Sequence, residues 1–142
     1  MKTATYLNFN GQTEEAFEFY RSVFGGEFIG SITRMGDMPA MPGSENLPEA
    51  EKKLVMHVRL AITEDHSLMG TDILESMGMK LEHGNNVSIM LQPETRAELD
   101  RLYQKLSVGG RDLSPPKVEV WGDYFANLTD KFGIHWMLDV PA

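Results

Sequence analysis

The sequence uses one local pattern twice, and this repetition limits what the chain can fold into. In each copy an apolar-rich extended run leads to a threonine, an amphipathic helix and a pair of glycines. The extended runs are residues 3–10 and 85–92, and the helices begin near Thr13 and Thr95. The threonine and the glycine pair lie 12 residues apart in the first copy and 14 in the second, so the repeat is structural and not literal. A βα unit used twice predicts two similar modules packed around a shared space.

Length and hydrophobic content place both modules in one domain. A chain of 142 residues with 42% hydrophobic content can bury one sizeable core. Two modules of about 70 residues would each be marginal alone. We therefore expect a single domain over residues 1–142, with one module at about 3–72 and the other at about 85–140.

Charge and cysteine content exclude several classes of protein. A net charge of −8 and a pI near 4.9 oppose binding to nucleic acid or to an anionic membrane, because phosphate groups would be repelled. The chain has no cysteine, which rules out disulfides, thiol catalysis and zinc–thiolate sites and fits a reducing compartment. No apolar run is long enough to span a membrane, and the N-terminus lacks the apolar part of a signal peptide. These features predict a cytoplasmic protein without nucleic-acid or membrane partners.

The two helices are predicted from apolar periodicity and from their end signals. The first, over residues 13–24, has one apolar face and ends at Gly25. The second, over residues 95–106, opens with a capping box made of Thr95 and Glu98.

Apolar and alternating runs predict three further strands after each helix. With the opening runs they give a βαβββ order twice, so the fold class is α+β. The predicted strands cover residues 27–35, 54–62, 67–72, 111–120, 123–129 and 134–140.

Two long irregular segments interrupt this pattern, at residues 36–53 and 73–84. Loops of this length in a small domain are usually lids, binding loops or disordered. Both segments contain methionines, among them Met38 and Met41 in the first. Such residues either line a lid that closes over ligands of varied shape or simply fill gaps in the packing.

Three stretches of sequence carry a family resemblance. They are FNGQTEEAFEFYRSVFGG at 9–26, VMHVRLAI at 55–62 with LMGTD at 68–72, and WGDYFANLTDKFGIHW at 121–136. Together they resemble the PhnB-like branch of the glyoxalase/bleomycin-resistance/dioxygenase superfamily, also called vicinal oxygen chelate. The resemblance covers nearly the whole chain, and the order and spacing of the motifs make it specific.

The resemblance implies a particular architecture and mode of assembly. Relatives pair two βαβββ modules whose strands curl into a cup-shaped mixed sheet with the helices on the outer face. A homodimer commonly completes the cup. Relatives in this branch often carry the description 3-demethylubiquinone-9 3-methyltransferase, but nothing in the sequence resembles the glycine-rich loop that binds a methyl donor.

The resemblance also implies where a glyoxalase metal would lie. Aligning the chain places Thr5 at the first ligand position, Gly70 to Asp72 at the second, Asn86 at the third and Met137 at the fourth. At most one of these is a good ligand for zinc, nickel or iron, which favour imidazole or carboxylate. We therefore predict no metal at this site and no cofactor.

His57 is the best candidate for a chemically active group outside those positions. It lies in the middle of a predicted strand, and alternation places it on the same face as Arg59. A histidine and an arginine on one face suit an anionic ligand or general acid–base work, with Asp72 as the expected carboxylate neighbour. The alternative is that His57 hydrogen-bonds across the sheet and Arg59 pairs with an acid from the loop. His66, His83 and His135 are interpreted as surface or terminal-strand residues.

The first strand offers polar groups whose direction depends on its register. Tyr6 and Asn8 share one face, and Leu7 and Phe9 share the other. The apolar pair is expected to pack under the first helix, because an unpaired asparagine there would be costly. Direct alignment with glyoxalase would give the opposite assignment.

The last motif supplies an aromatic candidate surface. Trp121, Asp123 and Tyr124 open it, and an aromatic wall beside one carboxylate could orient a ligand. The alternative is that such aromatic residues belong to the core, which we favour for Trp136 but not for Trp121.

Two functions follow from these residues. The first is a homodimeric protein that binds a small organic molecule, with Tyr6, Asn8, Arg59, Asp72, Trp121 and Tyr124 as ligand contacts. The second is a metal-independent isomerase or lyase in which His57 moves a proton while Arg59 and Asn8 hold a developing oxyanion.

Overall fold

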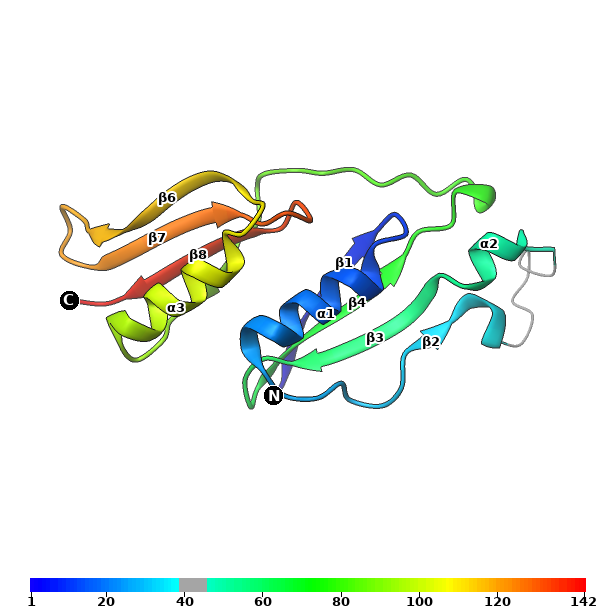
Figure 1. Ribbon diagram of the computed structural model, residues 1–142, viewed down its shortest axis with the longest axis horizontal. Coiled ribbons are helices and arrows are strands. Elements are labelled where there is room, and N and C mark those ends of the chain that lie inside the picture. Colours follow the sequence, from blue (N-terminus) through cyan, green and yellow to red (C-terminus); the bar gives the residue numbers. More distant parts are fainter. Residues whose placement is uncertain (39–45) are drawn as a thin grey trace. The chain divides into compact units, whose positions relative to one another are not determined.

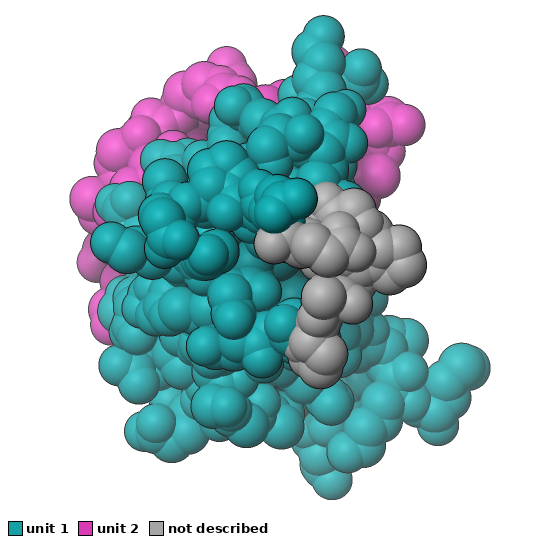
Figure 2. Space-filling view, turned by 90° about the vertical axis from the view of Figure 1, so that its right-hand side faces the viewer, with its two compact units in different colours: residues 1–82 teal, residues 83–142 magenta. Residues whose placement is uncertain are grey.

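Each half of the chain builds a four-stranded mixed sheet with one long helix along one face (Figure 1). The computed structural model describes residues 1–38 and 46–142. Contacts divide the chain into two units, residues 1–82 and residues 83–142 (Figure 2). The α+β class and the two βαβββ-like modules are thereby confirmed.

The first sheet has the strand order β1-β4-β3-β2. β1 runs parallel to β4, and the other neighbours are antiparallel. The elements of this unit are β1 (Thr3–Phe9), α1 (Thr13–Phe24), β2 (Thr33–Arg34), η1 (Met35–Asp37), α2 (Glu49–Lys52), β3 (Val55–Ala61), β4 (His66–Asp72) and η2 (Glu75–Met77).

The second sheet repeats this arrangement with the order β5-β8-β7-β6. β5 runs parallel to β8, and β8, β7 and β6 are antiparallel neighbours. The elements are β5 (Ile89–Leu91), α3 (Arg96–Leu106), β6 (Arg111–Val118), β7 (Tyr124–Thr129) and β8 (His135–Val140).

Helix α1 lies close over the centre of the first sheet. Leu7, Gly70 and Val58 form one row across β1, β4 and β3. A Cβ atom added to Gly70 would lie 2.5 Å from Cε2 of Phe17, so this row faces α1 and a side chain at position 70 would collide with the helix. Leu7 and Phe9 are buried, whereas Tyr6 and Asn8 are exposed. The burial argument for the register of the first strand is therefore confirmed.

Helix α3 covers the second sheet in the same way. The Tyr124 hydroxyl donates to Oδ1 of Asp100 on α3 at 2.8 Å, so the face of β7 that carries Tyr124 is the face under the helix. The residues of β7 and β8 that lie on this face are buried. They are Ala126, Leu128, Trp136 and Leu138.

Both predicted helices are confirmed, and so are most strands. The long strand expected over 27–35 is wrong: it reduces to an isolated bridge between Phe28 and Leu60 and the two-residue β2. Gly30 has φ +75° and the register shifts between Thr33 and Arg34, which interrupts pairing with β3. The strand expected over 85–92 is also shorter, because only β5 pairs with β8.

The two irregular segments differ in how far the structure describes them. Residues 39–45, and with them Met41 and the centre of the expected lid, lie outside the described residues. In the second segment Ile73 and Leu74 are buried in the first unit, while Met77 and Met79 are exposed. No helix among the described residues is long and apolar enough to cross a membrane.

Candidate functional site

The register of the first sheet gathers most of the predicted site residues on the face opposite α1. Tyr6, Met69 and Arg59 form one row across β1, β4 and β3. Asn8 and Thr71 are paired in the next row, which His57 joins because it lies two residues before Arg59 on β3. All six side chains project from the same side of the sheet, because paired residues and residues two apart share a face. Sequence reasoning predicted four of them, and the register adds Met69 and Thr71.

Tyr6 and His57 are in direct contact although β4 lies between their strands. The Tyr6 hydroxyl is 3.1 Å from Nδ1 of His57, and the two ring centroids are 5.8 Å apart. Partial desolvation of its hydroxyl raises the pKa of the Tyr6 phenol above its ordinary value of 10.0, although the side chain as a whole is exposed. When the Tyr6 hydroxyl donates a hydrogen bond to Nδ1 of His57, the imidazole carries its proton on Nε2.

Arg59 lies half-buried beside this pair and keeps most of its donors. Its Nε donates to Oγ of Ser67 at 3.2 Å. Within residues 1–38 and 46–142 no carboxylate forms an ion pair with it, so the guanidinium can take an anionic partner. The alternative in which an acid from the loop pairs with Arg59 is not seen among the described residues.

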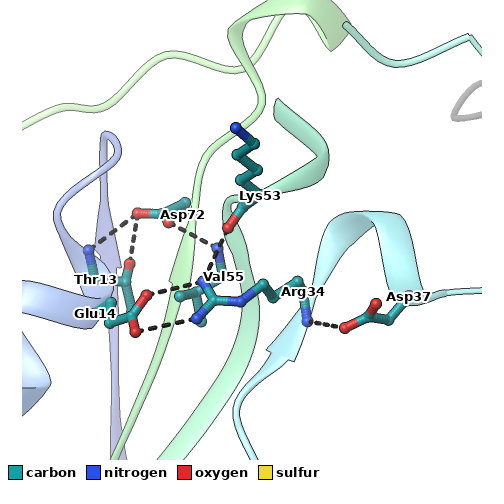
Figure 3. Close-up of polar contacts among 7 residues, drawn as sticks. All are labelled: Thr13, Glu14, Arg34, Asp37, Lys53, Val55 and Asp72. Atoms are coloured by element: carbon teal, nitrogen blue, oxygen red, sulfur yellow. Dashed lines mark hydrogen bonds and ion pairs between the residues drawn. The ribbon is translucent and has the colours of Figure 1, made fainter. Parts of the chain in front are cut away.

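The position expected for Asp72 is wrong. Asp72 alternates with Thr71 and lies on the α1 side of the sheet, away from His57 and Arg59, where it is 2% exposed. Its Oδ1 accepts hydrogen bonds from the backbone N–H of Thr13 at 3.1 Å and from the Thr13 hydroxyl at 2.7 Å. Its Oδ2 accepts from the N–H of Val55 at 2.9 Å (Figure 3). The carboxylate thus stabilises the start of α1 and the start of β3.

A second polar contact beside Asp72 was missed by the sequence analysis. Arg34 on β2 donates from Nη1 and Nη2 to the two carboxylate oxygens of Glu14, at 2.8 and 3.0 Å, and from Nη1 to the carbonyl of Lys53 (Figure 3). The hydrogen bond from Arg34 lowers the pKa of Glu14. Nothing in the sequence pairs these residues, because the contact depends on where β2 joins the sheet.

The two aromatic candidates of the last motif do not share a surface. Tyr124 lies on the α3 side of the second sheet, where its hydrogen bond to Asp100 raises its pKa and the guanidinium carbon of Arg96 lies 4.9 Å from its ring centre. Trp121 is 59% exposed and packs edge-on against Phe125, which alternates with Tyr124 and belongs to the opposite face. Asp123 accepts a hydrogen bond from the N–H of Ala142.

The aligned metal positions do not provide a fitting set of donors. The Thr5 hydroxyl is 2.9 Å from Nε2 of His66. The Asp72 carboxylate already accepts hydrogen bonds from Thr13 and Val55, and Met137 offers only a thioether. Across the described parts of the chain, no three His, Asp or Glu side chains gather to hold a metal ion. The absence of a metal in the purified protein stays a prediction.

Two other histidines have local partners. His66 lies between the hydroxyls of Thr3 and Thr5 at 2.7 and 2.9 Å. His135 lies 2.8 Å from the Thr129 hydroxyl through Nδ1 and 2.8 Å from the carbonyl of Gly84 through Nε2, which fixes the chain before β5. Neither ring lies on the face that carries His57.

The fold, two βαβββ-like modules each with a four-stranded mixed sheet, defines a protein of the glyoxalase-like class. A glyoxalase/bleomycin resistance protein from Albidiferax ferrireducens T118 has the same fold, with a TM-score of 0.62, 14% identity and coverage of 97% of each chain. Protein PA1353 from Pseudomonas aeruginosa is more similar, with a TM-score of 0.82, 30% identity and coverage of 99% of this chain and 98% of that one.

Sequence comparison then gives the family. Residues 1–138 match the family described as 3-demethylubiquinone-9 3-methyltransferase, and the chain belongs to this PhnB-like family. The PhnB protein from Bacillus cereus is 28% identical with a TM-score of 0.75, and the match covers 99% of each chain. The resemblance stated from the sequence motifs is confirmed.

Proposed function

We propose that the protein binds a small organic molecule with an anionic group on the face of the first sheet opposite α1, without a metal. The observation that carries the proposal is the register that brings Tyr6, Asn8, His57 and Arg59 to one face. Binding sites for small molecules combine apolar surface with a few convergent polar groups.

The residues of this face suit a planar organic anion. Arg59 supplies a cation without a carboxylate partner among the described residues, and the phenol of Tyr6 and the imidazole of His57 add donors beside it. Met69 lies in the row between Tyr6 and Arg59 and offers an apolar, adaptable surface for a ring or chain.

Titration with benzoate, followed by amide NMR, tests this proposal. We expect the perturbed amides to lie on β1, β3 and β4, and Arg59→Gln to weaken binding by about tenfold or more, since a charge-assisted hydrogen bond contributes about 1.5–3 kcal/mol. Arg111→Gln is the matched control, because it removes the same charge from an exposed side chain of β6. Equal weakening by both variants, or perturbations confined to the second unit, would contradict the proposal.

The contact between Tyr6 and His57 favours a second candidate function, a metal-independent isomerase or lyase. Such enzymes remove a proton next to a carbonyl group, and a histidine oriented by a neighbouring hydroxyl is a suitable acid or base. Arg59 and Asn8 lie on the same face, where they can stabilise an oxyanion.

Exchange of the methyl protons of pyruvate for deuterium separates the two functions. In the enzyme, His57→Ala lowers the exchange rate by a factor of about 10² or more, and Tyr6→Phe lowers it less because the imidazole remains. In a protein that only binds, the wild type exchanges no faster than His57→Ala, and the substitution alters affinity alone, by about 1–3 kcal/mol.

We also propose that the protein forms a homodimer. Both sheets expose large apolar or aromatic side chains on the faces opposite their helices, including Tyr6, Met90 and Trp121. A partner chain would cover such surface. Light scattering together with metal analysis of the purified protein tests the assembly and the metal-free state; a monomer, or one tightly bound transition metal per chain, would contradict them.

A further inference from the structure

The face of the second sheet opposite α3 carries a carboxylate beside two aromatic rings. Asp139 on β8 is paired directly with Phe125 on β7, so their side chains lie next to each other on this face. Trp121 packs edge-on against Phe125, with ring centroids 5.9 Å apart. Gln92, just after β5, donates from Nε2 to Oδ2 of Asp139 at 3.2 Å.

Asp139 is the buried carboxylate with the fewest donors among the described residues. Asp72 and Asp130 are 2% and 0% exposed, and each accepts hydrogen bonds from at least three donors at 2.7 to 3.1 Å. Asp139 is 7% exposed, yet the neutral amide of Gln92 is the one side chain of the described residues that donates to it. A buried carboxylate is costly unless it is paired, and its two oxygens can accept about four hydrogen bonds.

Two cations of this unit that lie close to β7 have other partners. Lys117 lies beyond Phe125 on β6, and its ammonium nitrogen is 3.5 Å from Oε1 of Glu119. Arg96 stands over the ring of Tyr124 on the α3 side of the sheet. In the part of the chain that the structure describes, no lysine or arginine forms an ion pair with Asp139.

We propose that this face is a second binding site, which takes an organic ammonium group. The ammonium donates to Asp139, and the carbon skeleton of the ligand rests against Phe125 and the exposed ring of Trp121. Aromatic rings attract organic cations, and a buried carboxylate adds a charge-assisted hydrogen bond. The site lies within the second unit and does not depend on the anion site proposed on the first sheet.

Benzylammonium is the probe, and tryptophan fluorescence is the first readout. The chain has two tryptophans, and Trp121 is 59% exposed whereas Trp136 is 1% exposed, so a ligand on this face changes the emission of Trp121. We expect saturable binding of benzylammonium and at least about tenfold weaker binding of benzyl alcohol, which has the same ring but no charge. A response to benzyl alcohol of equal affinity would overturn the proposal.

Asp139→Asn tests the carboxylate with nearly unchanged shape. It should weaken benzylammonium binding by about tenfold or more. Asp112→Asn is the matched control, since it removes the same charge from an exposed position of β6 and should leave the affinity unchanged. Equal weakening by both variants would show an effect of net charge alone and would overturn the proposal.

Two further measurements keep the test decisive if Asp139→Asn disturbs the sheet. Trp121→Ala changes an exposed ring and should weaken benzylammonium binding by about threefold to tenfold. In the wild-type protein, amide NMR should show benzylammonium perturbing the Gln92 side-chain amide and the Trp121 indole N–H. If benzylammonium shifts neither the Gln92 side-chain amide signal nor the Trp121 indole N–H signal, the proposal is overturned whatever the variants do.

Discussion

The two units of the chain share one strand order but stabilise it with different polar contacts. In the first unit, Asp72 lies at the end of β4 and joins the start of α1 to the start of β3. In the second, Asp130 lies in the turn before β8, where it accepts hydrogen bonds from the N–H groups of Phe132 and Ile134 and from the indole of Trp136. The same topology therefore leaves different backbone donors buried, and each unit satisfies its own set with one carboxylate.

The helices also begin and pack differently. The first turn of α3 is capped within the helix, where the Thr95 hydroxyl accepts a hydrogen bond from the N–H of Glu98, whereas α1 relies on a carboxylate from β4. In the central row under α1 the strand β4 provides Gly70, while the corresponding row of the second sheet has Leu138 on β8 and the small Ala126 on β7. Each sheet makes room for its helix on a different strand.

The faces opposite the helices carry different charged groups. The first sheet presents Arg59 and His57, and the second presents the buried Asp139 and, beyond Phe125, Lys117, whose ammonium group is paired with Glu119. A duplicated module has thus acquired two chemically different surfaces, which is why we assign an anionic ligand to one and a cationic group to the other.

Removing Asp72 or Asp130, the carboxylates that satisfy buried donors in the two units, should give the largest and most different effects on stability. Asp72→Ala leaves the N–H groups of Thr13 and Val55 without an acceptor, and we expect it to lower the free energy of unfolding by about 3 kcal/mol. Hydrogen exchange should then rise in α1 and β3. Asp130→Ala should be comparably destabilising but should raise exchange around the turn before β8 and alter Trp136 fluorescence. Identical exchange patterns for both variants would refute the assignment of separate roles.

Gly70→Ala tests the close approach of α1 to its sheet. The new Cβ would meet Cε2 and Cζ of Phe17 at 2.5 and 2.9 Å, and we expect a loss of about 1–3 kcal/mol in the free energy of unfolding. Gly84→Ala serves as the control for adding a methyl group, because Gly84 does not have a positive φ and the new Cβ would meet Oδ1 of Asn86 at 3.4 Å, an ordinary contact distance. Urea denaturation measures both, and a neutral Gly70→Ala would mean that α1 does not pack as closely as described.

Thr95→Ala tests the local cap of α3. The substitution removes the hydroxyl that accepts from the N–H of Glu98 at 3.2 Å, and we expect it to cost about 1 kcal/mol. Thr95→Ser keeps the acceptor and should be close to wild type. The effect should be smaller than that of Asp72→Ala, since the capped end of α3 is exposed to water.

Glu14→Gln should have the smallest effect and a defined dependence on pH. Hydrogen bonding to Arg34 lowers the pKa of Glu14 below its ordinary value of 4.5. A depressed pKa in the folded state means that the ion pair stabilises the protein above that ordinary value and that this stabilisation is lost as pH falls through the folded-state pKa. Because the side chains are 37% and 47% exposed, solvent screening limits the contribution to under about 1 kcal/mol. Denaturation at pH 7 and at pH 3 measures it, and the difference in stability between the wild type and Glu14→Gln should be smaller at the lower pH.

The elements with strong periodicity were predictable from the sequence. Both helices begin and end within one residue of their predicted bounds, because apolar periodicity and the residues at helix ends are local features of the sequence. The cap at Thr95 was also predicted, although the Glu98 side chain pairs with Arg101 and does not complete the capping box. The strand over 27–35 was not predictable, because a positive φ at Gly30 and a bulge interrupt an otherwise extended stretch.

The candidate site was predictable only in part. Alternation placed His57 with Arg59, and the burial argument placed Tyr6 with Asn8, because each pair lies on one strand. The role of Asp72 was misjudged because it depends on which donors the start of α1 leaves unsatisfied. Asp139 carried no signal in the sequence, since a single acid on a terminal strand gains meaning only from Phe125 and Gln92 beside it.

The sequence by itself determined the duplicated βαβββ plan, the family, and which residues on each strand share a face, since all of these follow from local periodicity and motif order. Tertiary structure decided which faces from different strands meet. The pairing of β1 with β4 and of β4 with β3 allows Tyr6 to reach His57, and the pairing of β7 with β8 sets Phe125 beside Asp139. Strand register is set by burial and pairing across long stretches of chain, and a shift of one residue would move every one of these side chains to the other face.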